Sequence, residues 1–503
     1  MSYGADMTTR LDRITQQRRD KLARLRSHGI NPYPHRYERS HTTEEAAALL
    51  EQCESGQTKE KQVSIAGRVM AIRRMGKGAF ADIRDGSGKI QLLFQDTDKL
   101  SGKQGELFKE LDIGDFIGVA GEVLRTRTGE PTVGVKHFTL LAKSLQPLPE
   151  KWHGLSDVDT RYRQRYLDLI SNPETKITFK ARSQIINVIR QFYNEHDFVE
   201  VETPVLQPSP GGALARPFVT HHHALDQDFY LRIAPELHLK RLIVGGLDRV
   251  YELGRIFRNE GVSTRHNPEF TMMESYQAYA DYNDVMDMLE EMVAWVSKKV
   301  MGTTKVKFGD YTINFKPPWP RLTLREAVEQ YSGIDFVTYP TADGLRDRMK
   351  DKMKELGLKV DPHKNWAKLV DELISTFVEP SLIQPTFLKD YPVSMSPLAK
   401  TIPGEERVVE RFEAFAGGME IANAFSELND PEEQRQRFVQ QQKERHEKDE
   451  ESWTIDEDYL LALEYGMPPT GGLGVGIDRL VMLLTNQPSI RGVILFPQLR
   501  EKA

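Results

Sequence analysis

The first third of the chain alternates between apolar and polar residues with the two-residue period of β-strands. This alternation recurs in five segments, which are residues 63–69, 79–83, 89–94, 115–124 and 132–140. Glycine-containing turns separate several of these segments, as at Gly86 and Gly129. Residues 106–111 have helical spacing instead. The pattern therefore predicts five strands with one short helix between the third and the fourth.

This order of elements matches the OB-fold, a small β-barrel that often binds single-stranded nucleic acid. We therefore expect four parts in the chain: a helical extension over residues 1–60, the barrel over 61–145, a proline-containing linker over 146–160 and a second domain over 161–503. The second domain mixes strands and helices without the regular alternation of a parallel sheet. The expected fold class is α+β.

A basic amphipathic helix is predicted near the start of the chain. Residues 10–26 carry seven Arg or Lys side chains against two Asp, and Leu11, Ile14, Leu22 and Leu25 recur at roughly helical spacing. Its basic face could bind nucleic acid, or the helix could simply pack on its own domain. The sequence leaves both alternatives open.

Composition narrows the class of protein. The 503 residues are 39% hydrophobic and 28% charged, which suits a folded chain of two or three domains. No run approaches the roughly 20 apolar residues of a membrane span, and residues 1–10 do not resemble a signal peptide. The single cysteine, Cys53, excludes an internal disulfide and favours the reducing cytoplasm. With a net charge of -6, nucleic acid would have to bind local basic patches.

Three segments of the second domain carry candidate chemistry. The first is a strand that ends at Pro204, which many folds contain. The second joins Arg258 and Glu260, expected on one side of a strand, to a loop with Arg265 and His266. A guanidinium there can clamp phosphate or carboxylate oxygens, whereas an isolated Arg-x-Glu would more often be an ion pair.

The third segment places glycines at 472, 474 and 476, with Arg479 after them. Alternate glycines leave one face of a strand bare, so that a flat ring such as adenine can approach the backbone. Arg479 could then stack on that ring. The spacing differs from that of dinucleotide-binding loops and of P-loops.

Together, Pro204, Phe257-Arg258-x-Glu260 and Gly472-x-Gly474-x-Gly476-x-Asp478-Arg479 resemble motifs 1, 2 and 3 of class II aminoacyl-tRNA synthetases. The resemblance covers nearly the whole chain and is closest to the bacterial lysyl branch, through residues 211–218, 231–237, 265–270 and 423–430. It implies an antiparallel catalytic sheet flanked by helices. It also implies an enzyme that activates L-lysine with ATP and transfers it to the 3′ end of tRNA(Lys).

The same resemblance implies the residues of a lysine pocket. The α-amino group would bind Glu236 and the backbone at Gly212, and the carboxylate would bind Arg258 and Asn423. The side chain of the substrate would meet the remaining pocket residues, which are Glu274, Tyr276, Phe425 and Glu427. A buried ammonium needs carboxylate partners, and the same carboxylates would repel aspartate.

The ATP, metal and tRNA sites are likewise implied by the resemblance. The ATP residues would be Arg258, Glu260, Arg265, His266, Asn267, Phe270, Glu413, Glu420 and Arg479. Arg258 and Arg479 would be catalytic, and Glu413 and Glu420 would hold Mg²⁺, an ion that keeps waters and bridges carboxylates to phosphates. Arg68, Phe80 and Gln91 would read the anticodon, although Phe80 could instead belong to the barrel core.

Several alternatives stay open at this stage. An aspartyl or asparaginyl synthetase is the nearest rival, and a non-catalytic tRNA-binding or regulatory paralogue is a rival of another class. Relatives that lysylate a protein would lack the barrel, and those that serve lipid modification would carry membrane spans. The resemblance implies a homodimer. His221-His222-His223 could suggest a metal site, but we expect none because no acidic or cysteine residue stands beside these histidines.

Overall fold

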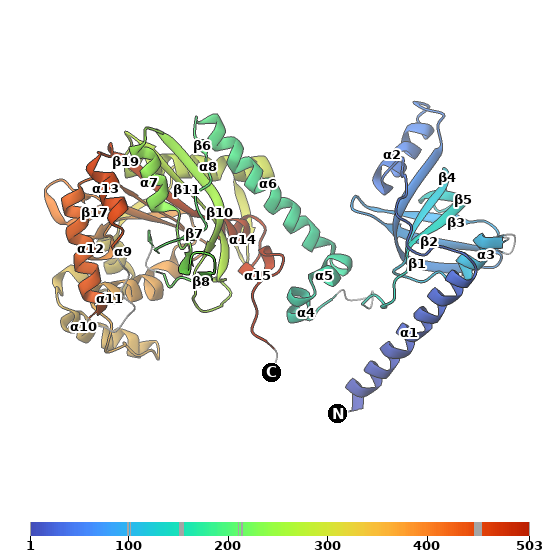
Figure 1. Cartoon of the computed structure of the whole chain (residues 1–503), viewed down its shortest axis with the longest axis horizontal. Coiled ribbons are helices and arrows are strands. Elements are labelled where there is room, and N and C mark those ends of the chain that lie inside the picture. Colours follow the sequence, from blue (N-terminus) through green and yellow to red (C-terminus); the bar gives the residue numbers. More distant parts are fainter. Residues whose placement is uncertain are drawn as a thin grey trace. The chain divides into compact units, whose positions relative to one another are not determined.

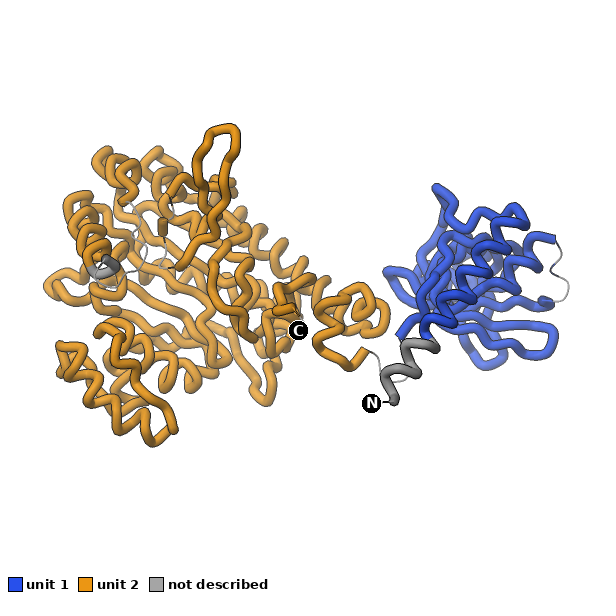
Figure 2. Tube along the Cα trace, turned by 60° about the horizontal axis from the view of Figure 1, so that its bottom comes forward, with its two compact units in different colours: residues 1–154 blue, residues 155–503 orange. Residues whose placement is uncertain are grey.

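A computed structural model describes residues 2–97, 100, 102–149, 155–209, 211–212, 215–446 and 455–501. It divides the chain into two units, residues 1–154 and 155–503 (Figure 2). Part of the expected linker over 146–160 lies outside the described residues, as do Ala213 and Leu214. None of the helices in the described ranges is long and apolar enough to cross a membrane.

Five strands of the first unit close into a barrel with the order β1-β2-β3-β5-β4. Their bounds are β1 Gln62–Met75, β2 Gly78–Arg84, β3 Lys89–Phe94, β4 Phe116–Arg125 and β5 Pro131–Ala142. The helix α3 (Gly102–Lys109) lies between β3 and β4, as predicted. The barrel closes because β3 pairs parallel with β5 while β1 pairs antiparallel with β4. Alternate apolar residues such as Val63 and Ile65 fill its interior, which is the reason for the period-two pattern.

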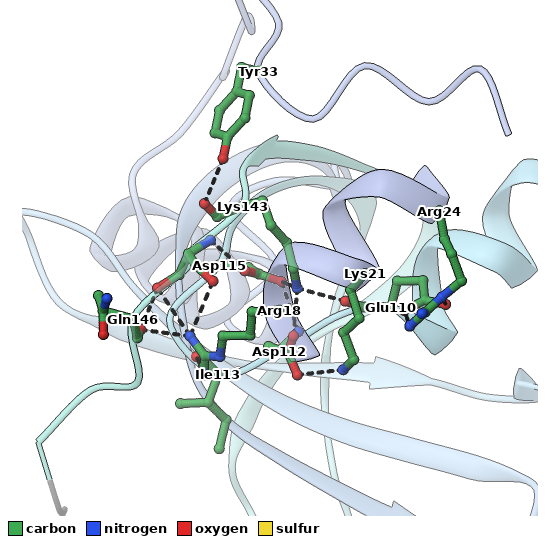
Figure 3. A network of polar contacts seen from close by, with 11 residues as sticks. Arg18, Lys21, Arg24, Tyr33, Glu110, Asp112, Ile113, Asp115, Lys143 and Gln146 are labelled. Atoms are coloured by element: carbon green, nitrogen blue, oxygen red, sulfur yellow. Dashed lines mark hydrogen bonds and ion pairs between the residues drawn. The ribbon is translucent and has the colours of Figure 1, made fainter. Parts of the chain in front are cut away.

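Two helices precede the barrel, α1 (Ser2–Ser27) and α2 (Thr43–Glu54). Three basic side chains of α1, those of Arg18, Lys21 and Arg24, are bonded to groups of the same unit (Figure 3). Arg18 donates to the carbonyl oxygens of Ile113 and Gln146 at 2.8 and 2.7 Å, and Arg24 donates to the Glu110 carboxylate. Leu25 is fully buried in the barrel core. The second alternative for this helix, packing on its own domain, is therefore confirmed.

Beneath α1, a buried lysine ties two loops of the barrel together (Figure 3). The Lys143 ammonium donates to the carboxylates of Asp112 and Asp115 at 2.7 and 2.8 Å, and to the Glu110 carbonyl oxygen at 2.7 Å. Lys21 of α1 donates to the other oxygen of Asp112. Two carboxylates thus meet two ammonium groups, and every donor of Lys143 is used.

The second unit is built around a mostly antiparallel sheet with the order β14-β15-β17-β18-β19-β11-β10-β6, with β16 paired to β17 (Figure 1). The strands are β6 Val199–Glu200, β10 Arg249–Phe257, β11 Glu269–Ala278, β14 Arg321–Thr323, β15 Thr386–Pro392, β16 Thr401–Ile402, β17 Glu405–Ala416, β18 Met419–Ser426 and β19 Thr470–Gly476. Two small sheets join β12 (Lys305–Phe308) to β13 (Tyr311–Asn314), and β7 (Leu206–Gln207) and β8 (Val219–His222) to β9 (Gln227–Leu231). The expected antiparallel catalytic sheet is present.

Helices pack on both faces of this sheet. The helices are α4 Val158–Arg163, α5 Arg165–Ser171, α6 Pro173–Glu195, α7 Glu236–Val244, α8 Tyr282–Met301, α9 Leu324–Ser332, α10 Ala342–Glu355, α11 Trp366–Leu373, α12 Pro431–His446, α13 Glu457–Glu464, α14 Ile477–Leu484 and α15 Ile490–Val493. The largest core lies where α6, α8 and α14 pack on β11, β18 and β19. The helix α7 contacts β10 and β11 on the face opposite that covered by α8 and α14. A capping box between Asp281 and Asp284 stabilises the start of α8, shortly after the end of β11.

Replacing Lys143 by Met should destabilise the barrel, because the buried carboxylate of Asp115 would lose its cation. Burial already raises the pKa of Asp115 against the influence of Lys143. Breaking a buried ion pair from one side costs about 3–5 kcal/mol. Hydrogen exchange measured on the full chain should show faster exchange in β4 and β5. Lys136→Met, which breaks the exposed pair with Glu122, is the matched control and should leave their protection unchanged.

Candidate functional site

The central strands of the large sheet present their two faces to different surroundings. Met273, Ala424 and Leu473 point into the core beneath α8 and α14. The residues between them point to the opposite face, since side chains alternate along a strand. The strand register then aligns them in two rows: Glu274, Gly474 and Asn423 in one, and Tyr276, Gly472 and Phe425 in the other. Alternation in three neighbouring strands therefore assembles polar residues from distant parts of the chain.

A cavity of about 530 Å³ lies over these rows. It brings together every residue expected to bind an amino acid or ATP except Glu413. These lining residues are Gly212, Glu236, Arg258, Glu260, Arg265, His266, Asn267, Phe270, Glu274, Tyr276, Glu420, Asn423, Phe425, Glu427 and Arg479. The cavity is therefore lined by both carboxylate and cationic side chains.

Three buried carboxylates define the acidic end of the cavity, and each comes from a different element. Glu236 begins α7, Glu274 lies on β11, and Glu427 follows β18, with 6%, 5% and 1% of their surfaces exposed. Tyr276 donates its hydroxyl to Glu274 at 3.1 Å. One buried cation, Lys240, contacts both Glu236 and Glu427. No sequence motif indicated a role for Lys240.

Burial changes the protonation of this end of the cavity. Burial, and next the neighbouring Glu236, raise the pKa of Glu274 to about 8. Burial also raises the pKa of Glu236 and of Glu427, in both cases against the influence of Lys240. For Lys240 itself, burial lowers the pKa, but Glu236 and Glu427 together outweigh it and raise the pKa. Two of the three carboxylates contact Lys240, and the charges of Arg411 and Arg258 also lower the pKa of Glu236 and of Glu274. Because the pKa values of all three carboxyl groups are raised in spite of these cations, this end of the cavity can accept further positive charge.

Glycines make room for these carboxylates. A Cβ atom at Gly472 would lie 1.8 Å from Oε1 of Glu427 and 2.7 Å from the Tyr276 ring. Gly212 has a φ of +82°, and a Cβ there would lie 3.1 Å from the Cβ of Glu236. A bare glycine face was expected beside adenine. At Gly472, the space is instead filled by an acidic side chain.

Arginines also line the cavity, and the charge of one of them, Arg258, lowers the pKa of Glu274. The Arg258 guanidinium lies 5.3 Å from the centre of the Phe270 ring and donates to the Ile233 carbonyl oxygen at 3.3 Å. Arg479 donates to the Glu420 carboxylate at 3.1 Å and lies 3.3 Å from Nε2 of His266. Burial, followed by Arg479, lowers the pKa of His266. These groups offer positive charge and hydrogen-bond donors to an anionic ligand.

The loop residues expected to bind ATP have partners within the protein. Arg265 donates to the Glu379 carboxylate at 2.6 Å. Asn267 donates to the Glu269 carbonyl oxygen at 2.6 Å and accepts from the backbone of Gln498 at 3.1 Å. Glu260 is exposed and lines the cavity. Because β10 ends at Phe257, the expectation that Arg258 and Glu260 alternate along a strand is wrong: both lie just beyond the strand end.

Arg411 was missed by the sequence analysis, although it stands two residues before Glu413. It donates to Oδ1 of Asn423 at 3.0 Å, to Glu413 at 2.5 Å and to the Met395 carbonyl oxygen at 2.8 Å. Glu413 also accepts a hydrogen bond from Tyr391 at 2.8 Å, and burial raises the pKa of its carboxyl group to about 7. Arg411 thereby orients Asn423 on the cavity wall.

Motif 3 is tied to the rest of the sheet by Asp478, which the sequence analysis noted without a role. Its carboxylate accepts from Arg182 of α6 at 2.5 Å and from the backbone of Thr271 at 2.6 Å. Arg479 follows directly and faces the cavity. The position of Arg479 therefore depends on a buried carboxylate one residue before it.

The residues expected to read an anticodon lie on the barrel. Phe80 and Gln91 are half-buried and alternate with core residues such as Ala81 and Leu92, so Phe80 is not in the barrel core. Gln91 accepts a hydrogen bond from the Thr132 hydroxyl at 3.1 Å. Arg68 donates to the Gly114 carbonyl oxygen at 3.0 Å and lies over the Phe116 ring at 4.2 Å.

The histidine triplet has acidic neighbours, contrary to expectation. His221 and His223 converge, with ring centres 5.2 Å apart, and Nδ1 of His221 lies 2.8 Å from Asp228. Asp226 is 3.4 Å from its other nitrogen. Even so, within the described part of the chain, no group of three or more His, Cys, Asp or Glu residues is placed to hold a metal ion.

Comparisons with known proteins agree with this geometry. The family model for class II tRNA synthetases of types D, K and N matches residues 157–500, and the model for OB-fold nucleic acid binding domains matches residues 63–146. These matches confirm the expected fold class, an OB-fold barrel followed by a class II synthetase domain.

Similar full-length relatives carry one name, lysine–tRNA ligase. The chain is 63% identical over 491 residues to the one from Dehalococcoides mccartyi (strain ATCC BAA-2266 / KCTC 15142 / 195), covering 97% of this chain and 98% of the relative. It is 55% identical to that of Moorella thermoacetica over 96% and 97% of the two chains. Identity to that of Bacillus subtilis (strain 168) is 51%, over 97% of each.

Replacing Gly472 by Ala should destabilise the second unit, because the new methyl group would displace Glu427 or Tyr276. Overpacking of this kind costs about 1–3 kcal/mol. Gly474→Ala is the matched control on the same face of β19, since its Cβ would meet no atom closer than 3.7 Å. Thermal unfolding of the full chain should show a lower melting temperature for Gly472→Ala only. Equal melting temperatures would contradict the steric argument.

Proposed function

We propose that this chain, which belongs to the family of class II tRNA synthetases, activates L-lysine with ATP and transfers it to tRNA(Lys). One observation carries the proposal: a single cavity is lined both by buried carboxylates and by arginines. A long cationic amino acid and a polyphosphate would each find the complementary charge there. The shared name of the similar relatives supports the same substrate.

The acidic end favours lysine over the amino acids of neighbouring subfamilies. Glu236 and the backbone at Gly212 would hold the α-ammonium, while Glu274, Tyr276 and Glu427 would surround the ε-ammonium. Phe425 would pack along the methylene chain. An aspartate side chain would meet like charge at Glu274 and Glu427, and an asparagine side chain would leave buried charge unpaired. An aspartyl or asparaginyl enzyme is therefore disfavoured.

The basic end suits adenylate formation. A carboxylate oxygen of lysine, held by Arg258 and Asn423, would attack the α-phosphorus of ATP in line, and pyrophosphate would leave. Arg258 would stabilise charge on the α-phosphate, Phe270 and Arg479 would flank the adenine, and Glu260 would meet its amino group. Arg265, His266 and Asn267 would contribute to binding the remaining nucleotide groups. Such catalysis requires positioning and charge stabilisation, without a protein nucleophile.

Transfer would follow in the same cavity. The 3′ hydroxyl of the terminal tRNA ribose would attack the carbonyl carbon of lysyl-adenylate, and AMP would leave. A non-catalytic tRNA-binding paralogue would be expected to lack part of the nucleotide site. Arg258, Glu260, Glu420 and Arg479 all line the cavity, which favours the catalytic alternative.

Glu413 and Glu420 are the proposed magnesium ligands. Glu420 lines the cavity, whereas Glu413 lies behind Arg411, and the charge of Glu420 contributes to the raised pKa of Glu413. A divalent cation would relieve that repulsion, so this pair fits an ion that takes its other ligands from water and phosphate. When bound, Mg²⁺ would neutralise phosphate charge. Arg411 and Tyr391 would orient Glu413.

The barrel would bind the anticodon. Phe80 offers a ring for stacking on a base, Gln91 offers amide groups for a base edge, and Arg68 offers a cation. Their position on the outer surface of the barrel strands supports this assignment.

We also propose a homodimer, as expected for the family, acting in the cytoplasm. Apolar side chains near motif 1 support an interface there: Val199, Val205 and Leu206 are 49%, 39% and 46% exposed. Exposed apolar residues gathered on neighbouring elements often mark a protein contact. The free Cys53 is consistent with a reducing compartment.

Pyrophosphate exchange with each of the twenty amino acids, with and without tRNA, tests the proposed function. Only lysine should support rapid exchange. Arg258→Ala should lower kcat/KM by about 10²- to 10³-fold, because it removes charge stabilisation at the α-phosphate. Arg255→Ala is the matched control, since Arg255 is exposed and pairs with Glu269. Full exchange in a folded Arg258→Ala variant, or exchange driven by aspartate, would refute the assignment.

Lysine affinity should depend on pH through the acidic end of the cavity. Since the pKa of Glu274 is raised to about 8, its carboxyl group is mostly protonated at pH 7 and must lose a proton to bind an ammonium. Affinity should therefore fall as the pH drops below 8, approaching about tenfold per pH unit. The titratable or charged groups facing this end are Glu236, Lys240, Arg258, Tyr276 and Glu427.

Calorimetry from pH 6.5 to 8.5 would measure this dependence. In buffers of different ionisation enthalpy it should also detect proton release on lysine binding. Glu274→Gln should bind lysine weakly with a flatter pH dependence in this range. A wild-type affinity that is constant across the range would contradict the role of Glu274.

A further inference from the structure

Lys240 is a buried lysine with no place in the proposed contacts to substrate. It lies on α7, one turn after Glu236, and its ammonium donates to Oε1 of Glu236 at 2.6 Å. The same ammonium is in ion-pair contact with Oε2 of Glu427, which comes from the end of β18. The rings of Phe425 and Tyr459 lie 5.3 and 6.0 Å from it. Lys240 therefore joins two proposed substrate-binding carboxylates from separate elements.

Lys240 stands behind the wall of the cavity. None of its surface is exposed, and it is not among the described residues that line the cavity, whereas Glu236 and Glu427 both are. A substrate would thus approach these carboxylates from the open side while Lys240 holds them from the buried side. Lys240 need not leave for a ligand to bind.

We propose that Lys240 is a positioning and specificity-determining residue, which fixes Glu236 and Glu427 and matches the charge of the pocket to lysine. This inference deepens the proposed function and rests on it. It identifies the ligand class of the pocket as an amino acid with two ammonium groups.

The balance of charge carries the proposal. Glu236, Glu274 and Glu427 supply three negative charges when ionised, and Lys240, which contacts two of them, supplies one positive charge. The charge of Arg411 also acts on Glu236, but Arg411 is paired with Glu413, so two negative charges remain. Lysine brings two ammonium groups, while Arg258 would balance its carboxylate. With a neutral residue at position 240, three buried carboxylates would face two ammonium groups. Since an uncompensated buried charge is costly, one carboxylate would stay protonated and would be a poorer acceptor.

The geometry adds positional control. Glu236 would receive the α-ammonium and Glu427 the ε-ammonium, so the distance between them must suit the length of the lysine side chain. Lys240 donates a hydrogen bond to Glu236, forms an ion pair with Glu427, and is itself part of the helix α7. A two-sided contact of this kind limits how far the two carboxylates can drift apart before substrate arrives.

Lys240→Met in the full chain tests the proposal. Loss of a contacting cation raises a carboxylate pKa by about 1–3 units. We therefore expect the pKa values of Glu236 and Glu427 to rise when Lys240 is replaced. The midpoint of the pH dependence of the lysine KM should then move up by about one unit or more. At pH 7, the lysine KM in pyrophosphate exchange should rise about tenfold for each unit of that shift, while the KM for ATP stays within about twofold. Lys240→Arg, which keeps the cation, should restore the wild-type midpoint.

Two further variants make the result decisive. Lys143→Met removes an equally buried lysine from two carboxylates of the barrel and should leave the lysine KM unchanged. Lys240→Gln keeps a hydrogen-bond donor without the charge, and it replaces Lys240→Met if that variant does not fold. An unchanged midpoint and lysine KM in a folded neutral variant would overturn the proposal. Absence of lysine-dependent exchange in the wild type would instead refute the proposed function.

Discussion

The charge of three carboxylates buried around one ammonium is the constraint on which the catalytic unit depends. Glu236, Glu274 and Glu427 lie in a setting where burial disfavours their ionised forms, and Lys240 compensates only part of their charge. The shortfall makes this region a receptor for cations. A fully compensated cluster would be stable and inert, whereas an uncompensated one would protonate.

The sheet makes this arrangement possible, because alternation separates what stabilises the fold from what binds a ligand. On β11, Met273 packs into the core while Glu274 faces the cavity. On β19, Leu473 packs into the core, and Gly472 leaves the space that the Glu427 carboxylate occupies. The site is therefore built on rigid strands, and its support comes from buried groups such as Asp478 and Arg411, whose hydrogen bonds fix the neighbouring cavity residues.

Strand periodicity, a local property, was sufficient to predict the barrel, whereas most cavity residues were predicted from the resemblance to class II synthetases. The sequence did not predict contacts between residues that are distant along the chain and come together only in the fold. Glu236 was expected in the pocket, but the role of Lys240 one helical turn later was missed, because only the contact with Glu427 shows that it joins two elements. The acidic neighbours of His221 were missed because Asp226 and Asp228 arrive through a hairpin. The strand end before Arg258 was missed because alternation alone does not mark a boundary.

Each unit contains a buried lysine paired with two carboxylates, but the pairing stabilises the fold in one unit and belongs to a binding site in the other. In the barrel, Lys143 meets Asp112 and Asp115, Lys21 adds a second ammonium, and the charges balance. In the catalytic unit, Lys240 meets Glu236 and Glu427, but Glu274 adds a third carboxylate instead of a second cation. Because its positive and negative charges are equal in number, the cluster in the barrel requires no ligand and can hold the loops of the barrel together. The unbalanced cluster remains incomplete until cationic groups enter the cavity, and for that reason a buried ion pair can belong to a binding site.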